Sequence, residues 1–191
     1  PLKYNGVVYN EMKGAFSSPD EVLEREIMNH LFPDTTYGCE SGGDPKNIPD
    51  LTYENFLNFH RTYYHPSNSY IYLYGNMDME EKLAFLDEHY LSHFDYLDVD
   101  SVIQEQKAFG ACQDVTLEYP VAENEGEEDN TYLSYNMVVG NAADSQMAMA
   151  FEVLDYALLS APGAPLKQAL LDVKAGKDVY GSYDDGILQP Y

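Results

Sequence analysis

The segment GVVYNEMKGAFSSPD, residues 6–20, gives the clearest structural signals in the chain, because it holds one amphipathic helix and the start of a second. Residues 5–16 predict a helix despite two glycines. At about 100° per residue, Glu11 falls between Val7 and Ala15 on the apolar arc of that helix. Ser18 then provides an N-cap, with Pro19 at the first helical position, and predicts a second helix that ends before Pro33.

Similar signals in the rest of the chain predict four more helices and several strands. The helices are expected to open at Thr52, at Asp78 and at 144, and to cover 166–172. Alternating or tyrosine-rich segments predict strands at 69–74, 115–121 and 131–139. This order predicts an α+β fold with helices packed on a mainly antiparallel sheet. Periodicity fades over 95–110, where we expect a linker between two unequal parts.

Composition excludes some classes of partner. The chain has 33 acidic residues against 10 Lys and Arg, a formal net charge of −23. Nucleic acid is therefore a poor partner, because phosphate backbones are bound by clustered cations. No run reaches the roughly 18–20 apolar residues that a membrane span needs. Cys39 and Cys112 belong to no C-x-x-C motif, which fits free thiols in a reducing compartment such as the cytoplasm and leaves a single disulfide open.

The first residue is Pro1, with no signal-peptide pattern after it, and the last residues resemble a strand cut short. We therefore expect both ends to be boundaries within a longer protein, so that the location of that protein stays open.

Glu11 is the candidate functional residue of the first helix. A carboxylate in an apolar arc needs a cation, hydrogen-bond donors or a metal, because burying it alone is costly. From the residues alone, a salt-bridged or hydrogen-bonded Glu is the commoner arrangement, and a metal ligand is the alternative.

Two other patterns are weaker signals. His89 and His93 form H-x-x-x-H on the expected fourth helix, and a spacing of four places both on one face, where they could chelate a metal. No H-E-x-x-H accompanies them, and helix-border histidines are the commoner case. Residues 41–45, SGGDP, lack the Lys-Ser/Thr ending of a phosphate loop and predict a shaped turn instead.

Four blocks of the sequence together resemble the pitrilysin/insulinase-type zinc metallopeptidases, in particular their presequence-protease branch. They are GVVYNEMKGAFSSPD (6–20), LFPDTTYGCESGGDPKNIPDLTYENFLNFHRTYYHPSNSYIYLYG (31–75), VLDYALLSAPGAPLKQALLD (153–172) and GILQPY (186–191). Such peptidases carry H-x-x-E-H, whose two histidines bind zinc and whose Glu is the general base. Their third zinc ligand is a Glu on a later helix, and Glu11 matches that position. No H-x-x-E-H occurs in this chain.

The resemblance implies parts of two related domains of a clamshell-shaped metallopeptidase. Residues 1–97 would be the later part of the catalytic domain, 98–110 a linker and 111–191 the beginning of the second domain. Zinc is the expected cofactor of the intact protein, and peptide substrates and the remainder of the parent chain are the expected partners. With one zinc ligand and no general base, the chain alone is expected to be inactive and to lack zinc. One rival function is a non-catalytic scaffold or peptide-binding relative, and another is a cation-binding module that uses His89 and His93.

Overall fold

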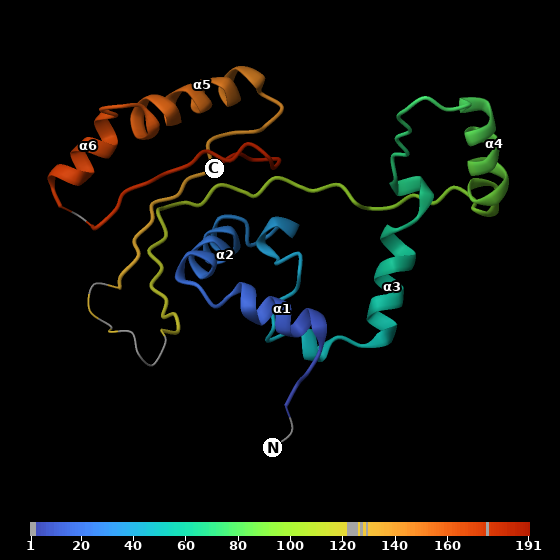
Figure 1. Ribbon diagram of the computed structural model, residues 1–191, viewed down its shortest axis with the longest axis horizontal. Helices are drawn as coiled ribbons and strands as arrows, with labels where there is room; N and C mark the ends of the chain where they lie inside the picture. Colours follow the sequence, from blue (N-terminus) through green and yellow to red (C-terminus); the bar gives the residue numbers. More distant parts are fainter. Residues whose placement is uncertain (1–2, 122–125, 127, 129, 175) are drawn as a thin grey trace. The chain divides into compact units, whose positions relative to one another are not determined.

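The computed structural model describes residues 3–121, 126, 128, 130–174 and 176–191 (Figure 1). The helices are α1 (Val7–Ala15), α2 (Pro19–Leu31), α3 (Tyr53–Tyr63), α4 (Met79–His89), α5 (Ser145–Asp155) and α6 (Pro165–Asp172). Short 3-10 turns cover Thr36–Gly38, Ile48–Asp50, Pro66–Asn68 and Leu91–His93, and a π-helical turn, Tyr156–Ser160, continues α5. Among the residues that the structure describes, no helix is long and apolar enough to cross a membrane.

The helix starts follow from the capping residues, as the sequence predicted. The hydroxyl of Ser18 accepts from the backbone N–H of Glu21 at 3.3 Å, and the carboxylate of Asp78 accepts from that of Glu81 at 3.1 Å. Thr52 opens α3 with a reciprocal capping box. Each cap satisfies backbone donors that have no partner within the helix.

The prediction of an α+β fold with a mainly antiparallel sheet is wrong. Residues 3–121, 126, 128, 130–174 and 176–191 form helices, turns and extended segments but no strand. Segments 69–74, 115–121 and 131–139 are extended, yet a strand also needs a neighbouring backbone that supplies a continuous ladder of hydrogen bonds. Alternating side chains indicate only that a segment suits such a ladder.

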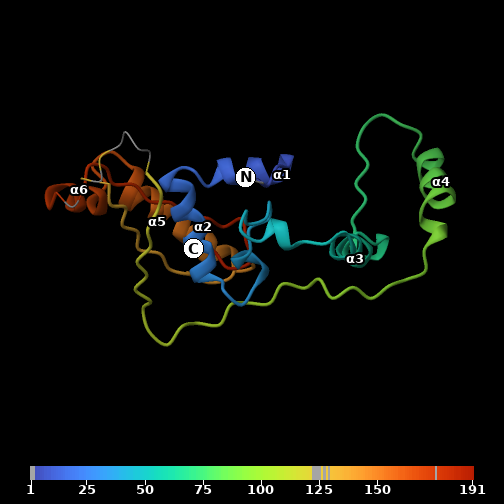
Figure 2. The same ribbon diagram turned by 90° about the horizontal axis from the view of Figure 1, so that it is seen from below.

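The chain divides into two compact units, residues 1–9 with 44–102 and residues 10–43 with 103–191. The first unit contains α3 and α4, which Figures 1 and 2 show as separate helices joined by an extended segment. Here the hydroxyl of Ser67 accepts from the backbone N–H of Leu97 at 3.1 Å, and Ser101 donates to the side chain of Asn68 at 2.6 Å. These bonds fasten the segment after α4 to the turn Pro66–Asn68. The domain limits expected from the sequence remain a prediction.

The second unit is centred on Phe32, which directly follows α2 and is fully buried. Its ring meets Tyr37 edge-on at 5.9 Å and Tyr191 at 6.1 Å between ring centroids. The hydroxyl of Tyr37 also accepts from the backbone N–H of Leu188 at 3.1 Å. The end of α2 and the C-terminal segment are therefore held together around one aromatic side chain.

Gln106 forms a second link within this unit, which we name the amide clasp. Its side chain accepts from the backbone N–H of Asp34 at 2.9 Å and donates to the Asp34 carboxylate at 2.8 Å. Its own backbone N–H donates to the side chain of Gln189 at 2.6 Å. These bonds satisfy the polar groups of the buried Gln106.

The C-terminal segment runs back past α5 (Figure 1). The rings of Phe151 and Tyr183 stack at 5.8 Å, and Val139 donates to the carbonyl of Pro190 at 2.8 Å. A hollow of 480 Å³ opens between the π-helical turn, α6 and this segment, and Ser160, Lys167 and Tyr180 are among the residues that line it.

Tyr191 gives the unit a predicted sensitivity to alkaline pH. Its pKa is raised above the ordinary 10.0, first because burial disfavours the phenolate and then because the carboxylates of Asp184 and Glu24 repel it. A raised pKa contributes stability that is complete below pH 10 and is lost as the pH rises through the folded-state value. We expect Tyr191→Phe to flatten the fall in urea midpoint above pH 10, whereas Tyr70→Phe, at a fully exposed position, should not.

Candidate functional site

Glu11 lies in the middle of α1, and its side chain is exposed. The apolar arc on which it lies is itself open, since Val7 is 85% and Val8 54% exposed. No hydrogen bond or ion pair joins the Glu11 carboxylate to another of the described side chains. Glu11 is therefore an available anionic ligand on an uncovered apolar face, and its role as a zinc ligand remains a prediction.

The residues required for a complete zinc site are not assembled. In the described part of the chain, no three His, Cys, Asp or Glu side chains lie close enough to hold a metal together. A catalytic zinc takes three protein ligands and keeps one open position. The described residues therefore do not fit a zinc ion by themselves, and Glu11 could supply at most one ligand.

The two histidines of the H-x-x-x-H pattern do not share a helix, which corrects the expectation from their spacing. α4 ends at His89, because Tyr90 has φ −140° and ψ −66°, and His93 lies in the following 3-10 turn. A spacing of four places side chains on one face only within a continuous helix. The His89 ring instead packs on Phe85, 4.6 Å between centroids.

The other three histidines have structural partners. His30 donates from Nδ1 to the carbonyl of Glu26 at 2.7 Å, and His60 stacks on Tyr64 at 4.9 Å. His65 accepts from the backbone N–H of Ser67 at 3.2 Å.

The glycine-rich segment forms a turn, as its sequence predicted. The backbone N–H of Gly43 donates to the carbonyl of Glu40 at 3.1 Å, and Gly43 has φ +89°, a conformation that favours glycine. Gly42 lies so close to Met12 of α1 that a Cβ added at Gly42 would overlap the Met12 sulfur. The turn therefore supports α1 one residue after Glu11.

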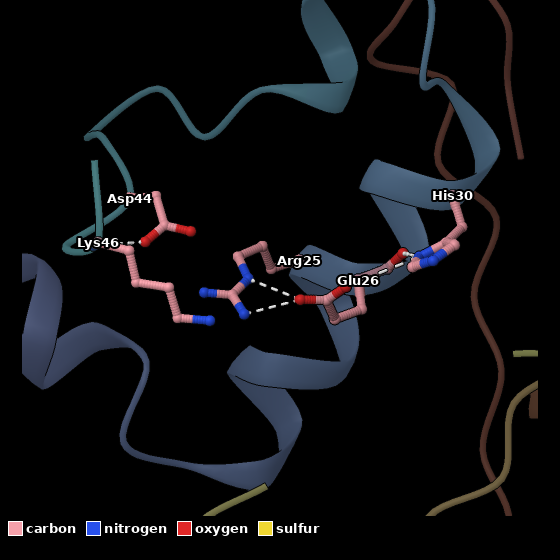
Figure 3. Close-up of polar contacts among 5 residues, drawn as sticks. All are labelled: Arg25, Glu26, His30, Asp44 and Lys46. Atoms are coloured by element: carbon pink, nitrogen blue, oxygen red, sulfur yellow. Dashed lines mark hydrogen bonds and ion pairs between the residues drawn. The ribbon is translucent and has the colours of Figure 1, made fainter. Parts of the chain in front are cut away.

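Sequence reasoning missed the charged cluster on α2, which is drawn in Figure 3. Arg25 donates to one carboxylate oxygen of Glu26 from Nη2 at 2.7 Å and from Nε at 3.2 Å. Its guanidinium also lies 4.4 Å from the ring centroid of Phe16, just beyond the end of α1. Both charged side chains are largely buried, Arg25 14% and Glu26 19% exposed. No periodic signal marks the contact between Arg25 and Phe16, because it crosses a turn between two helices.

We expect the 191-residue chain to bind zinc only weakly, because a lone carboxylate is a poor zinc site. Isothermal titration with zinc should show no stoichiometric tight binding to the wild-type chain. Tight one-to-one binding that disappears in His89→Ala would contradict this prediction and support a cation site on α4.

Known proteins resemble the chain over almost its whole length. A family model described as the peptidase M16 inactive domain matches residues 50–189. Protein HypA of Clostridium perfringens is 52% identical over 188 residues, 98% of this chain and 19% of that relative. The chloroplastic/mitochondrial presequence protease 1 of Arabidopsis thaliana is 39% identical over 193 residues, 99% of this chain and 18% of the relative. The mitochondrial presequence protease of Xenopus laevis is 35% identical over 179 residues, 93% and 17% respectively.

The chain thus spans about a fifth of the length of these curated relatives. The family model begins at residue 50, so it covers neither α1 with Glu11 nor α2 with Arg25.

Proposed function

Because the chain belongs to the M16 peptidase family, we propose that it is one part of a larger zinc-dependent metalloendopeptidase that hydrolyses peptides and short unfolded segments. The resemblance to the presequence-protease branch of the pitrilysin/insulinase type is confirmed by the relatives. The observation that carries the proposal is this similarity, which extends over 93% to 99% of the chain to proteins named presequence proteases. Glu11 would supply the third zinc ligand, while two histidines and a general base would come from outside these 191 residues.

The position of Glu11 supports this role. Its carboxylate is exposed and lies in the middle of a regular helix, so that it can approach a metal held by other residues. Two neutral imidazoles and one carboxylate leave zinc an open position. When bound, such a zinc ion acidifies a water molecule and polarises the carbonyl group of the peptide. The contribution of this chain would be to hold one anionic ligand in place.

We propose the remainder of a longer polypeptide as the main partner, and peptides as substrates. Among the described hydrophobic residues, Phe32 and Ala164 are the buried ones, and most large apolar side chains are exposed. Apolar surface on this scale favours burial against further protein.

A non-catalytic scaffold or peptide-binding subunit is the second candidate. The observation in its favour is that the matching family model describes an inactive domain and covers residues 50–189. The two candidates differ in the sequence that precedes Pro1 in the full-length protein. An H-x-x-E-H motif there favours the peptidase, and its absence favours the scaffold.

The direct test uses the purified full-length protein and an unfolded peptide. We expect cleavage that stops when a chelator removes zinc and returns when zinc is added. The 191-residue chain is the matched control and should show no cleavage under either condition. A full-length protein that binds the peptide without cleaving it, with or without zinc, would contradict the peptidase and support the scaffold.

A further inference from the structure

Asn5 and Gly6 are both exposed and lie directly before α1, which begins at Val7. Asn5 is the one asparagine of the sequence that a glycine follows. A side chain on the following residue would crowd the asparagine amide, whereas glycine has no Cβ and leaves the backbone conformationally free. The dipeptide therefore brings an amide carbonyl group and an accessible backbone nitrogen together outside any helix.

The backbone N–H of Gly6 donates no hydrogen bond to any of the residues that the structure describes. Since Gly6 precedes the first residue of α1, its N–H is among the groups that a helix leaves without an internal acceptor. Gly186, which follows Asp185, differs in this respect, because its N–H donates to the Asp184 carboxylate at 2.8 Å. The nitrogen of Gly6 can therefore lose its proton to a base in the solvent and act as a nucleophile.

We propose that Asn5 is a site of spontaneous deamidation, a reaction that does not depend on the proposed function. The backbone nitrogen of Gly6 attacks Cγ of Asn5, the bond from Cγ to the amide nitrogen breaks, and ammonia leaves a five-membered succinimide ring behind. One water molecule then adds to either carbonyl carbon of the ring and breaks the bond from that carbon to the ring nitrogen. The product is aspartate or isoaspartate in place of Asn5. The net reaction consumes water and releases ammonia, and it needs no oxidant or reductant.

Either product places a new carboxylate at the N-terminal end of α1, where a negative charge is favourable. The first turn of α1 has no acidic residue, and the N–H groups at the start of a helix carry a partial positive charge. The ring of Tyr4 lies 5.9 Å from the ring of Tyr9 in α1, which keeps the segment that contains Asn5 beside this turn. Deamidation therefore stabilises the first turn of α1 as the protein ages.

The first experiment follows the conversion of asparagine by peptide mass spectrometry, in the 191-residue chain and in the full-length protein, both aged at neutral pH. Because glycine leaves the following nitrogen uncrowded, we expect Asn5 to be converted about ten-fold or more faster than Asn76. Asn76 is the internal control, since it is also exposed and outside a helix but precedes Met77. Gly6→Ala should slow the conversion of Asn5 to the rate of Asn76. A Cβ fits at this position, because its nearest neighbour would be Cβ of Tyr9 at 3.8 Å.

The second experiment measures hydrogen exchange of the α1 amides in the variant Asn5→Asp. We expect exchange about two- to five-fold slower than in the wild type, the range that one favourable charge at a helix end gives. Asn76→Asp should leave the exchange of α1 unchanged. Conversion of Asn5 that is no faster than that of Asn76, in either protein, overturns the deamidation site. Exchange that is not slowed in Asn5→Asp overturns the stabilisation of α1.

Discussion

In the full-length peptidase that we propose, Glu11→Gln should lower zinc affinity and peptide hydrolysis together, by more than the ~10- to 100-fold typical of residues around the ligands. The substitution preserves the shape of the side chain but removes the anionic ligand. Because Glu11 is exposed in the middle of α1, the thermal stability should change little. Bound zinc, melting temperature and peptide cleavage are to be measured on the same purified variant.

Glu88→Gln is the matched control, since Glu88 is an exposed glutamate in α4. It should keep wild-type zinc content and turnover. A purely structural role for Glu11 predicts the opposite pattern, with a lower melting temperature and unchanged zinc per folded molecule. Full zinc occupancy and full activity in Glu11→Gln would remove Glu11 from the site.

Phe32→Ala is expected to destabilise the second unit by about 3–5 kcal/mol, the usual cost of truncating a buried phenylalanine. The reason is that Phe32 is fully buried and its ring joins Tyr37 to Tyr191. Since folded domains are stable by only about 5–15 kcal/mol, this loss would remove a large share of the free energy of unfolding. Urea denaturation followed by circular dichroism measures the loss, and hydrogen exchange in α2 locates it.

Phe56→Ala in α3 makes the same chemical change at a site that is 68% exposed. We expect it to change the free energy of unfolding by less than about 1 kcal/mol, as is usual for surface positions. Equal losses in the two variants would show that Phe32 does not form the centre of its unit.

Local signals made the helices predictable. Ser18, Thr52 and Asp78 cap their helices through contacts three residues away, and such contacts depend on little else in the molecule. The predicted strands at 69–74, 115–121 and 131–139 were wrong, because a ladder depends on a partner segment that no local pattern identifies. The spacing of His89 and His93 failed for a similar reason, since Tyr90 ends the helix between them.

The candidate site was predictable only in part. Glu11 could be singled out because its position on the helical arc and its resemblance to a ligand position are both local features. Arg25 carries no such signal, because it reaches Phe16 across the turn between α1 and α2 and the pair has no helical spacing. The amide clasp formed by Gln106 is even harder to predict from the sequence, since the partners of Gln106 lie 72 and 83 residues away along the chain.

The second unit can complete its aromatic contacts only late in synthesis, because the residues that form them lie far apart in the sequence. Tyr37 beside Phe32 bonds to Leu188, which follows it by 151 residues. At about 5–20 residues per second, the ribosome needs roughly 8–30 s to make the second half of this contact. During that interval the aromatic end of α2 has emerged without the segment that covers it. We therefore expect chaperones that recognise exposed apolar segments to bind nascent chains until residues 188–191 have been made.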